Sequence, residues 1–441
     1  MSDTSTTADQ VERRDWRYFL QRPVIFIFFL GFSGGLPFPL VYATLTGWLE
    51  DADITRSTIS TFAWLGFAYS FKLLWSPLVD SLTLPLLTRW LGRRRAWLLA
   101  SQLALAISIF TLAGIDPANQ MTAFALVAVS VAFLSATQDI VIDAYRIESA
   151  EQEMQSVLAA SYQYGYRVAV VIGTAGAFYI AEFGSWPLAY KTMALGMSVG
   201  VITTLLCHEP NVRASVGQSL SGSFVAQARQ WIYIAIVEPF VDFVSRYKRW
   251  SFVMLAFIAT FYISDRVLGI LANPFYLDIG FTKAQIATVA KLYGFWVSLI
   301  GTGAGAAAIL KFGLPRCIVG AALFIVSTNL FFAAMAITGP RLELLTLTIS
   351  FDNFALGFGS TVMIVYMSSL VNIKFTATQY ALLSSIGTFA GKFLAGFSGD
   401  IQLAIGWFNF FLYAAATGIP AIILSILIAR RHSATVDVDA T

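Results

Sequence analysis

Long apolar segments recur along the whole chain, and each is long enough to cross a lipid bilayer as a helix. The hydrocarbon core is about 30 Å thick and requires roughly 20 apolar helical residues. Hydrophobic residues make up 57% of the 441 residues and charged residues only 12%, too little polar surface to cover a water-soluble fold. The sequence therefore predicts an all-α polytopic membrane protein with twelve transmembrane helices. We place them at residues 23–48, 57–80, 96–114, 121–147, 155–182, 187–207, 250–276, 284–310, 316–338, 342–371, 376–401 and 404–429.

The twelve segments form two groups of six around one polar stretch. Residues 208–249 carry too many charges to span a membrane, so we expect them to form a linker. Within it, residues 224–244 mix apolar and charged side chains, which predicts an amphipathic helix along the membrane surface. The predicted domains are an N-terminal tail (1–22), an N-terminal six-helix bundle (23–207), the linker (208–249), a C-terminal six-helix bundle (250–431) and a C-terminal tail (432–441).

Basic residues are distributed unevenly over the loops. If the N-terminus is cytoplasmic, nearly all Lys and Arg residues of the loops lie on the cytoplasmic side. Arg146 is counted here with the loop after the fourth segment. The loops on the opposite side contain only Arg56, Lys283 and Arg341. Positive residues concentrate in cytoplasmic loops, so both termini and the linker are predicted to be cytoplasmic. The net charge of +3 then gives no reason to expect nucleic acid. The two cysteines and two histidines lie at segment ends, so we expect no metal site and no cofactor.

Several ionisable residues lie deep inside predicted segments, where each costs at least about 2.5–3.5 kcal/mol to insert. Asp139 and Asp143 are one helical turn apart and share a face of the fourth segment. We expect Lys72 and Arg167 to be their counter-charges. A proton on either carboxylate would unbalance this cluster, which is the chemistry that couples a proton gradient to a conformational change. Ion pairs that only hold the N-terminal bundle together are the alternative.

Other polar and aromatic side chains in the segments complete a predicted binding set. Aromatic faces suit sugar rings, and cations suit carboxylates. The first segment is interrupted at 31–37 and the seventh at Asn273-Pro274, and interrupted helices in corresponding positions of two halves indicate a binding site between them. The predicted substrate-binding residues are Lys72, Gln138, Gln163, Tyr164, Arg167 and Tyr69 from the first half, with Asp265, Arg266 and Lys392 from the second.

The loop after the second segment contains a recognisable pattern. Ser76-Pro77-Leu78-Val79-Asp80, followed by Gly92-Arg93-Arg94-Arg95, resembles the helix 2–3 signature of the major facilitator superfamily. That resemblance implies two six-helix bundles built from inverted repeats. It also implies a gating role, with Asp80, Arg93, Arg94 and Arg95 forming a cytoplasmic latch that stabilises the outward-open state. The eight-residue spacing of Lys72 and Asp80 recurs in Lys392 and Asp400, at the opposite ends of their segments, as inverted repeats require.

More specific strings resemble the AmpG-type muropeptide permeases, from about residue 31 to 400. They are Gly31-Phe32-Ser33-Gly34-Gly35-Leu36-Pro37, Phe71-Lys72-Leu73-Leu74-Trp75-Ser76-Pro77, Ser135-Ala136-Thr137-Gln138-Asp139-Ile140-Val141-Ile142-Asp143-Ala144, Gly165-Tyr166-Arg167 and Ala377-Thr378-Gln379-Tyr380. The resemblance implies a multi-pass protein of the bacterial inner membrane. It implies proton-driven import of N-acetylglucosaminyl-1,6-anhydro-N-acetylmuramyl peptides for cell-wall recycling, with a role in β-lactam resistance. Some members have two extra helices between the halves, which this chain lacks. We expect a monomer whose partners are the glycopeptide, protons and the lipid bilayer.

Two other functions compete with this interpretation. Related siderophore permeases share the fold and several of these strings, and an iron chelate would also suit the mixture of charges and aromatic rings. The pair Asp139 and Asp143 further resembles half of the aspartate-rich metal motif of intramembrane prenyltransferases. Such an enzyme needs a second acidic motif to hold magnesium, and the sequence contains none, so we predict a transporter and not an enzyme.

Overall fold

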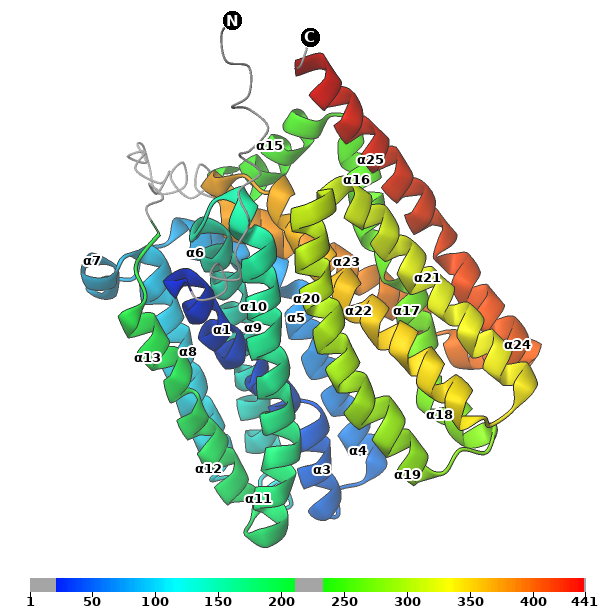
Figure 1. The fold of residues 1–441 in the computed structure, drawn as a ribbon. Coiled ribbons are helices and arrows are strands. Elements are labelled where there is room, and N and C mark those ends of the chain that lie inside the picture. Colours follow the sequence, from blue (N-terminus) through cyan, green and yellow to red (C-terminus); the bar gives the residue numbers. More distant parts are fainter. Residues whose placement is uncertain (1–20, 211–232, 440–441) are drawn as a thin grey trace, which may run out of the picture.

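The computed structural model describes residues 21–210 and 233–439, and every element in this part of the chain is helical (Figure 1). The predicted tail at 1–20 and the first part of the predicted surface helix, at 224–232, lie outside the described residues. The N-terminal half contains α1 (Arg22–Gly35), α2 (Pro37–Leu40), α3 (Ala43–Asp51), α4 (Arg56–Thr61), η2 (Phe62–Gly66), α5 (Phe67–Phe71), η3 (Lys72–Leu74), α6 (Ser76–Ser81), α7 (Leu87–Leu91), α8 (Arg93–Leu112), α9 (Met121–Glu148), η4 (Gln152–Met154), α10 (Gln155–Val171), η5 (Ile172–Gly176), α11 (Ala177–Phe183), α12 (Trp186–Gly196) and α13 (Ser198–Leu206).

The linker and the C-terminal half follow the same pattern of long helices. The linker ends in η6 (Tyr233–Val237) and α15 (Glu238–Tyr247). The C-terminal half contains α16 (Trp250–Phe261), α17 (Ile263–Gly269), α18 (Ala272–Asp278), α19 (Lys283–Gln285), η7 (Ile286–Tyr293), α20 (Gly294–Phe312), α21 (Leu314–Thr338), α22 (Leu342–Leu370), η8 (Ile373–Phe375), α23 (Thr376–Ala395), α24 (Ser398–Thr417) and α25 (Ile419–Asp439).

Ten helical stretches in the described ranges are long and apolar enough to cross a membrane, and they match ten of the twelve predicted segments. The two remaining segments are the second and the eleventh. The second is divided into α4, α5 and α6 by the tight 3₁₀ turns η2 and η3, and Pro77 at the start of α6 cannot donate a backbone hydrogen bond. The eleventh is the single 20-residue helix α23, whose polar residues lower its hydropathy. The all-α prediction is confirmed, and twelve segments are consistent with this arrangement.

The two halves meet along two sets of helices, one centred on α10 and the other on α23. On one side α10 packs against α20 and α22, and on the other α23 packs against α5, α6 and α9. Within the N-terminal half α1 lies in the groove between α9 and α10, and within the C-terminal half α22 packs against α20 and α21 (Figure 1). The second and eleventh segments therefore lie at the boundary between the halves, which explains why both carry more polar residues than a lipid-facing helix.

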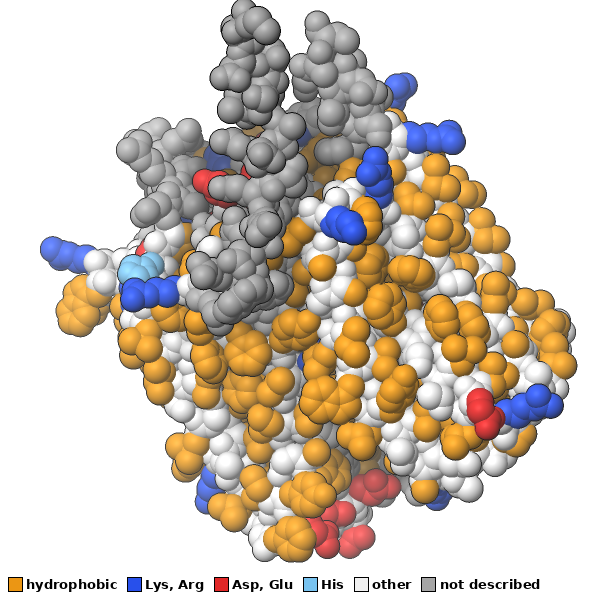
Figure 2. Space-filling model, viewed as in Figure 1, with side chains coloured by type: hydrophobic (Ala, Val, Ile, Leu, Met, Phe, Trp, Pro, Cys, Tyr) orange, Lys and Arg blue, Asp and Glu red, His pale blue; other side chains and the backbone are white. Residues whose placement is uncertain are grey.

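Apolar side chains also cover most of the described outer surface. Figure 2 shows hydrophobic groups over the middle of the molecule, whereas charged groups gather toward the two ends. Large side chains such as Phe110, Phe183, Phe252 and Leu403 are more than half exposed. Because a water-soluble protein does not expose so much contiguous apolar surface, this surface faces lipid, and the chain is a multi-pass membrane protein.

Glycine allows α1 and α10 to approach at backbone distance. A Cβ atom added at Gly165 would meet the carbonyl oxygen of Phe28, and one added at Gly31 would meet the carbonyl oxygen of Tyr162. We predict that Gly165→Ala lowers the free energy of unfolding by about 1–3 kcal/mol, since the helices must separate. Gly399→Ala is the matched control, because nothing lies within 4 Å of the added Cβ. Thermal unfolding in detergent would measure both, and equal stability of the two variants would contradict the prediction.

Candidate transport site and contacts between the halves

A cluster of buried charges occupies the N-terminal half where α9 faces η3. Lys72 Nζ lies 3.7 Å from Asp143 Oδ2, and Arg146 Nη2 lies 3.7 Å from Asp143 Oδ1. The Arg146 side chain is fully buried, and those of Lys72 and Asp143 are only 10% and 11% exposed. Lys72 was predicted from the sequence as a counter-charge of this acid. The second base among the described ion pairs is Arg146, one turn further along α9, and not Arg167.

Asp139 lies one turn before Asp143 and has a different environment. The residue is 8% exposed, and its Oδ1 has no hydrogen-bond partner among the residues that the structure describes. This oxygen faces α1, where a Cβ added at Gly34 would lie 3.2 Å from it. A buried carboxylate oxygen without a donor is costly as an anion. Gln138 is fully buried and donates to Ser33 Oγ on α1, so its side chain binds a neighbouring helix.

Three predicted binding residues on α10 contact the opposite half. Gln163 Nε2 donates to Ser360 Oγ at 2.7 Å, and the Tyr164 hydroxyl donates to the carbonyl oxygen of Leu299 at 3.2 Å. The Arg167 guanidinium donates to Ser298 Oγ on α20. The turn of α10 that carries Arg167 therefore spans the boundary between the halves. Arg167 was predicted to neutralise the acids of α9, but its guanidinium contacts an uncharged hydroxyl instead. It forms no ion pair among the described residues, so its charge could bind a substrate carboxylate.

The remaining predicted residues lie around the same central region. The Tyr69 hydroxyl donates to Ser135 Oγ at 2.8 Å, which joins the second segment to α9. Lys392 Nζ on α23 lies 3.4 Å from Ser70 Oγ in the opposite half. Arg266 extends from α17 toward α23, with its guanidinium 6.0 Å from the Tyr262 ring centroid. Asp265 precedes Arg266 on α17, and the two form no ion pair among those of the described residues.

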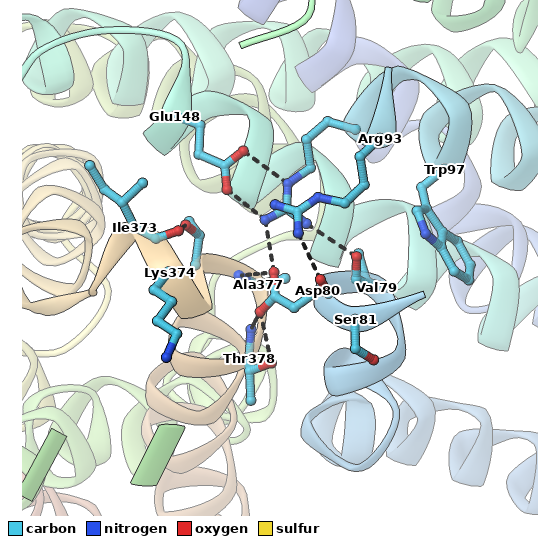
Figure 3. Close-up of polar contacts among 12 residues, drawn as sticks. Val79, Asp80, Ser81, Arg93, Trp97, Glu148, Ile373, Lys374, Ala377 and Thr378 are labelled. Atoms are coloured by element: carbon cyan, nitrogen blue, oxygen red, sulfur yellow. Dashed lines mark hydrogen bonds and ion pairs between the residues drawn. The ribbon is translucent and has the colours of Figure 1, made fainter. Parts of the chain in front are cut away.

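The residues of the latch predicted from the helix 2–3 signature lie close to Asp80, as Figure 3 shows. Arg94 Nη2 lies 2.8 Å from Asp80 Oδ1, and Arg94 Nε donates to Glu148 Oε2 at 2.9 Å. Arg93 donates to the carbonyl oxygen of Asp80 at 2.7 Å. Arg95 points elsewhere, because its guanidinium donates to the carbonyl oxygens of Thr204 and Leu205 at the end of α13. It therefore does not contact Asp80.

Asp80 also binds the opposite half of the molecule. Its Oδ2 accepts from the backbone N–H and the hydroxyl of Thr378 at 2.7 and 2.8 Å, and its Oδ1 accepts from the N–H of Ala377 at 3.3 Å (Figure 3). These donors belong to the first turn of α23, where free N–H groups and the helix dipole favour an anion. The carboxylate thus joins α6 to α23 at one end of the molecule.

Arg146 and Glu148 are buried members of these ion pairs that sequence reasoning missed. Both lie within the last turn of α9, which was interpreted as the beginning of a loop. The available signal was their spacing, since Asp139, Asp143 and Arg146 occur at intervals of four and three residues on one helical face. Glu148 is the last residue of the same helix, and its carboxylate pairs with Arg94. Because the fourth segment was ended too early, two buried charges were assigned to the loop that follows it.

Comparison with known structures identifies the class. The fold matches XylE, described as a proton:xylose symporter of the major facilitator superfamily, with a TM-score of 0.67, 13% identity, and coverage of 94% of this chain and 95% of that one. It also matches FucP, described as being in the outward conformation, with a TM-score of 0.66, 15% identity, and coverage of 92% and 98%. The protein has the major facilitator superfamily fold.

Similarity to proteins of known sequence identifies a narrower family than the fold does. The chain is 32% identical over 408 residues to the putative transporter AmpG 4 of Rickettsia felis, covering 92% of this chain and 96% of the relative. It is 30% identical over 417 residues to the anhydromuropeptide permease of Escherichia coli K12, covering 94% and 81%. A family model described as acetyl-coenzyme A transporter 1 matches residues 24–178. The chain belongs to the AmpG family of transporters.

Proposed function

We propose that this protein imports anhydro-muropeptides, the N-acetylglucosaminyl-1,6-anhydro-N-acetylmuramyl peptides, in symport with protons. Import would run from periplasm to cytoplasm across the bacterial inner membrane and would serve peptidoglycan recycling. The observation that carries the proposal is the buried cluster of Lys72, Asp143 and Arg146 beside Asp139, whose Oδ1 has no hydrogen-bond partner among the described residues, inside a chain related to anhydromuropeptide permeases. An ionisable side chain at this depth is costly, and reversible proton binding would give Asp139 a function that offsets this cost.

The chemistry of the central region suits a glycopeptide. Phe38, Tyr42, Tyr69 and Tyr166 form one aromatic group, with the Phe38 ring centroid 4.7 Å from Tyr42, 5.8 Å from Tyr69 and 6.2 Å from Tyr166. Aromatic faces of this kind bind the apolar faces of sugar rings. Cations at Arg167, Arg266 and Lys392 would attract the carboxylates of the peptide. The sugar part would therefore face the N-terminal half and the peptide part the boundary between the halves.

Transport would follow alternating access between the two six-helix bundles. The contacts of Asp80 with Ala377 and Thr378 close the end of the molecule that carries the helix 2–3 loop. We assign this end to the cytoplasm, because positive residues concentrate in the loops there. The latch would thus hold the outward-facing state until substrate and proton have bound, with the termini in the cytoplasm and the protein acting as a monomer.

The test is uptake into liposomes reconstituted with the purified protein. We expect labelled anhydro-disaccharide tripeptide to accumulate unchanged when the lumen is more alkaline than the medium, and only to equilibrate without a gradient. A ferric siderophore, supplied in parallel, should not enter. Uptake of the chelate in place of the glycopeptide, by protein shown to be folded, would contradict the proposal and favour the siderophore alternative.

Arg167 supplies a prediction about peptide recognition. Hydrogen bonds to charged groups contribute about 1.5–3 kcal/mol, so Arg167→Gln should weaken binding of the free-carboxylate tripeptide ligand by about 10- to 100-fold. A ligand whose peptide carboxylates are amidated should bind both proteins equally. Ser298→Ala is the matched control, since it removes the partner of Arg167 but not the charge. If Arg167→Gln weakens both ligands by the same factor, Arg167 does not bind the carboxylate.

A further inference from the structure

Arg146 has an unusual position for a buried cation. It lies on α9 in the N-terminal half and is fully buried. Its only ion-pair partner among the described residues is Asp143, and its Nη1 donates to Gln155 Oε1 at 3.3 Å. Gln155 is itself held in place, because its Nε2 donates to the carbonyl oxygens of Ile147 and Ala150. The guanidinium is therefore fixed with respect to its own half.

The same guanidinium also contacts the opposite half. Arg146 Nη2 donates to Ser368 Oγ on α22 at 3.1 Å. Ser368 gives its own proton to the carbonyl oxygen of Ile364, so its oxygen is free to accept from Arg146. In addition the guanidinium lies over the ring of Tyr380 on α23, 5.4 Å from the ring centroid. One cation thus touches Asp143 on one side and two helices of the C-terminal half on the other.

We propose that Arg146 is the positioning residue that transmits the protonation state of the buried carboxylates to the closure between the halves. The inference rests on the proposed proton coupling and adds the residue through which it acts. A protonated cluster would leave Arg146 without its compensating charge in a closed, water-poor boundary. Opening this boundary would hydrate the cation, so protonation would favour the cytoplasm-open state.

The charges around the cluster give the direction of the effect. The titratable groups packed around Asp143 are Lys72 of η3, Asp139 and Arg146 of α9, Tyr162 and Tyr166 of α10, and Tyr380 of α23. The tyrosines are uncharged near neutral pH, so two cations balance two carboxylates in the closed state. One bound proton leaves a net positive charge. With Gln in place of Arg146, the cluster is negative before protonation and neutral after it, so acid no longer opposes closure.

A buried cysteine would report closure of this boundary. Ala381 on α23 is 2% exposed and packs in an apolar cluster whose other members include Ile142 and Leu158 of the N-terminal half. In a background with Cys207 and Cys317 replaced by Ala, we would measure alkylation of Ala381→Cys in purified protein from about pH 8 to about pH 5.5. Dividing by the rate of Thr83→Cys, an exposed residue after α6, removes the intrinsic pH dependence of the thiol.

The expected results separate a transmitting role from a packing role. Without further changes, the normalised rate should rise by about 5-fold or more on acidification. Arg146→Gln should abolish this rise, and Arg146→Lys, which keeps the charge, should retain it. Ser368→Ala should speed alkylation at every pH but keep the rise. The inference is overturned if Arg146→Gln responds to acid like the parent, or if Arg146→Lys loses the response as fully as Arg146→Gln does.

The experiments distinguish a failure of the proposed function from a failure of the role of Arg146. If the parent itself shows no pH response and no gradient-driven uptake, proton coupling is wrong and the role of Arg146 falls with it. If the parent accumulates glycopeptide and responds to pH, but Arg146→Gln does the same, only the role of Arg146 is wrong. Exchange of labelled for unlabelled glycopeptide across the membrane would verify that each variant is folded and inserted.

Discussion

Asp139→Asn is expected to abolish uphill accumulation of substrate while leaving exchange across the membrane intact. The Oδ1 atom of Asp139 has no hydrogen-bond partner in the described part of the chain, so the amide removes a proton-binding group without breaking an ion pair. Each proton that enters down a membrane potential of 100 mV is worth about 2.3 kcal/mol, or about a 50-fold concentration ratio. Losing the proton site would reduce that ratio to about one. Uptake by reconstituted protein under an imposed gradient would measure it.

Asp143→Asn is the matched comparison for Asp139→Asn, because it neutralises a carboxylate on the same helix face that does form ion pairs. Asp143 is the ion-pair partner of both Lys72 and Arg146, so its neutralisation leaves two buried cations unpaired. We therefore expect Asp143→Asn to lose stability as well as accumulation, whereas Asp139→Asn should unfold at the temperature of the parent. Accumulation by Asp139→Asn to the level of the parent would remove Asp139 from the proton pathway.

Arg94→Gln is expected to have the largest effect on stability. Arg94 is 1% exposed and is the shared partner of Asp80 and Glu148. Breaking a buried pair by removing one partner costs about 3–5 kcal/mol, because the remaining charges stay buried without compensation. Arg95→Gln is the matched control, with the same change of charge at the next position. Its guanidinium contacts only backbone carbonyls of Thr204 and Leu205 among the described residues, so we expect a loss of about 1 kcal/mol.

Denaturant or thermal unfolding of the purified variants would give both values. The latch also predicts a change in conformation, because Asp80 without Arg94 holds the first turn of α23 less firmly. Alkylation of Ala381→Cys should therefore be faster in Arg94→Gln than in Arg95→Gln. Equal stability and equal alkylation of the two variants would show that Arg94 is an ordinary loop cation.

The membrane spans and the division into two halves could be predicted from the sequence, because both depend on the composition of long segments. Membrane spans follow from apolar length, and the two halves follow from the polar stretch at 208–249. The contacts of Lys72 with Asp143 and of Asp80 with Arg94 were also predictable, since a charge within a span needs a partner. These are the cases in which the cost of burying a group dictates what must lie beside it.

The sequence was insufficient where the end of a helix and the direction of a side chain decide the contact. Arg146 was counted as a loop residue, because a cation near the end of an apolar segment usually reaches the membrane surface. The helix in fact continues to Glu148, and Arg146 turns inward to Asp143. Arg167 has the depth expected of a counter-charge, but its direction on α10 points it toward Ser298 of the other half. Helix rotation, which periodicity in an all-apolar segment defines poorly, made this difference.

The most direct test of coupled transport is a pH recording outside proteoliposomes that carry no gradient. Adding anhydro-disaccharide tripeptide should make the weakly buffered medium more alkaline, because each imported molecule takes protons with it, and Asp139→Asn should abolish this change. A ferric siderophore should leave the pH constant. Entry of the labelled glycopeptide with no change of pH would contradict the account, since the buried carboxylates of α9 would then not couple transport to protons.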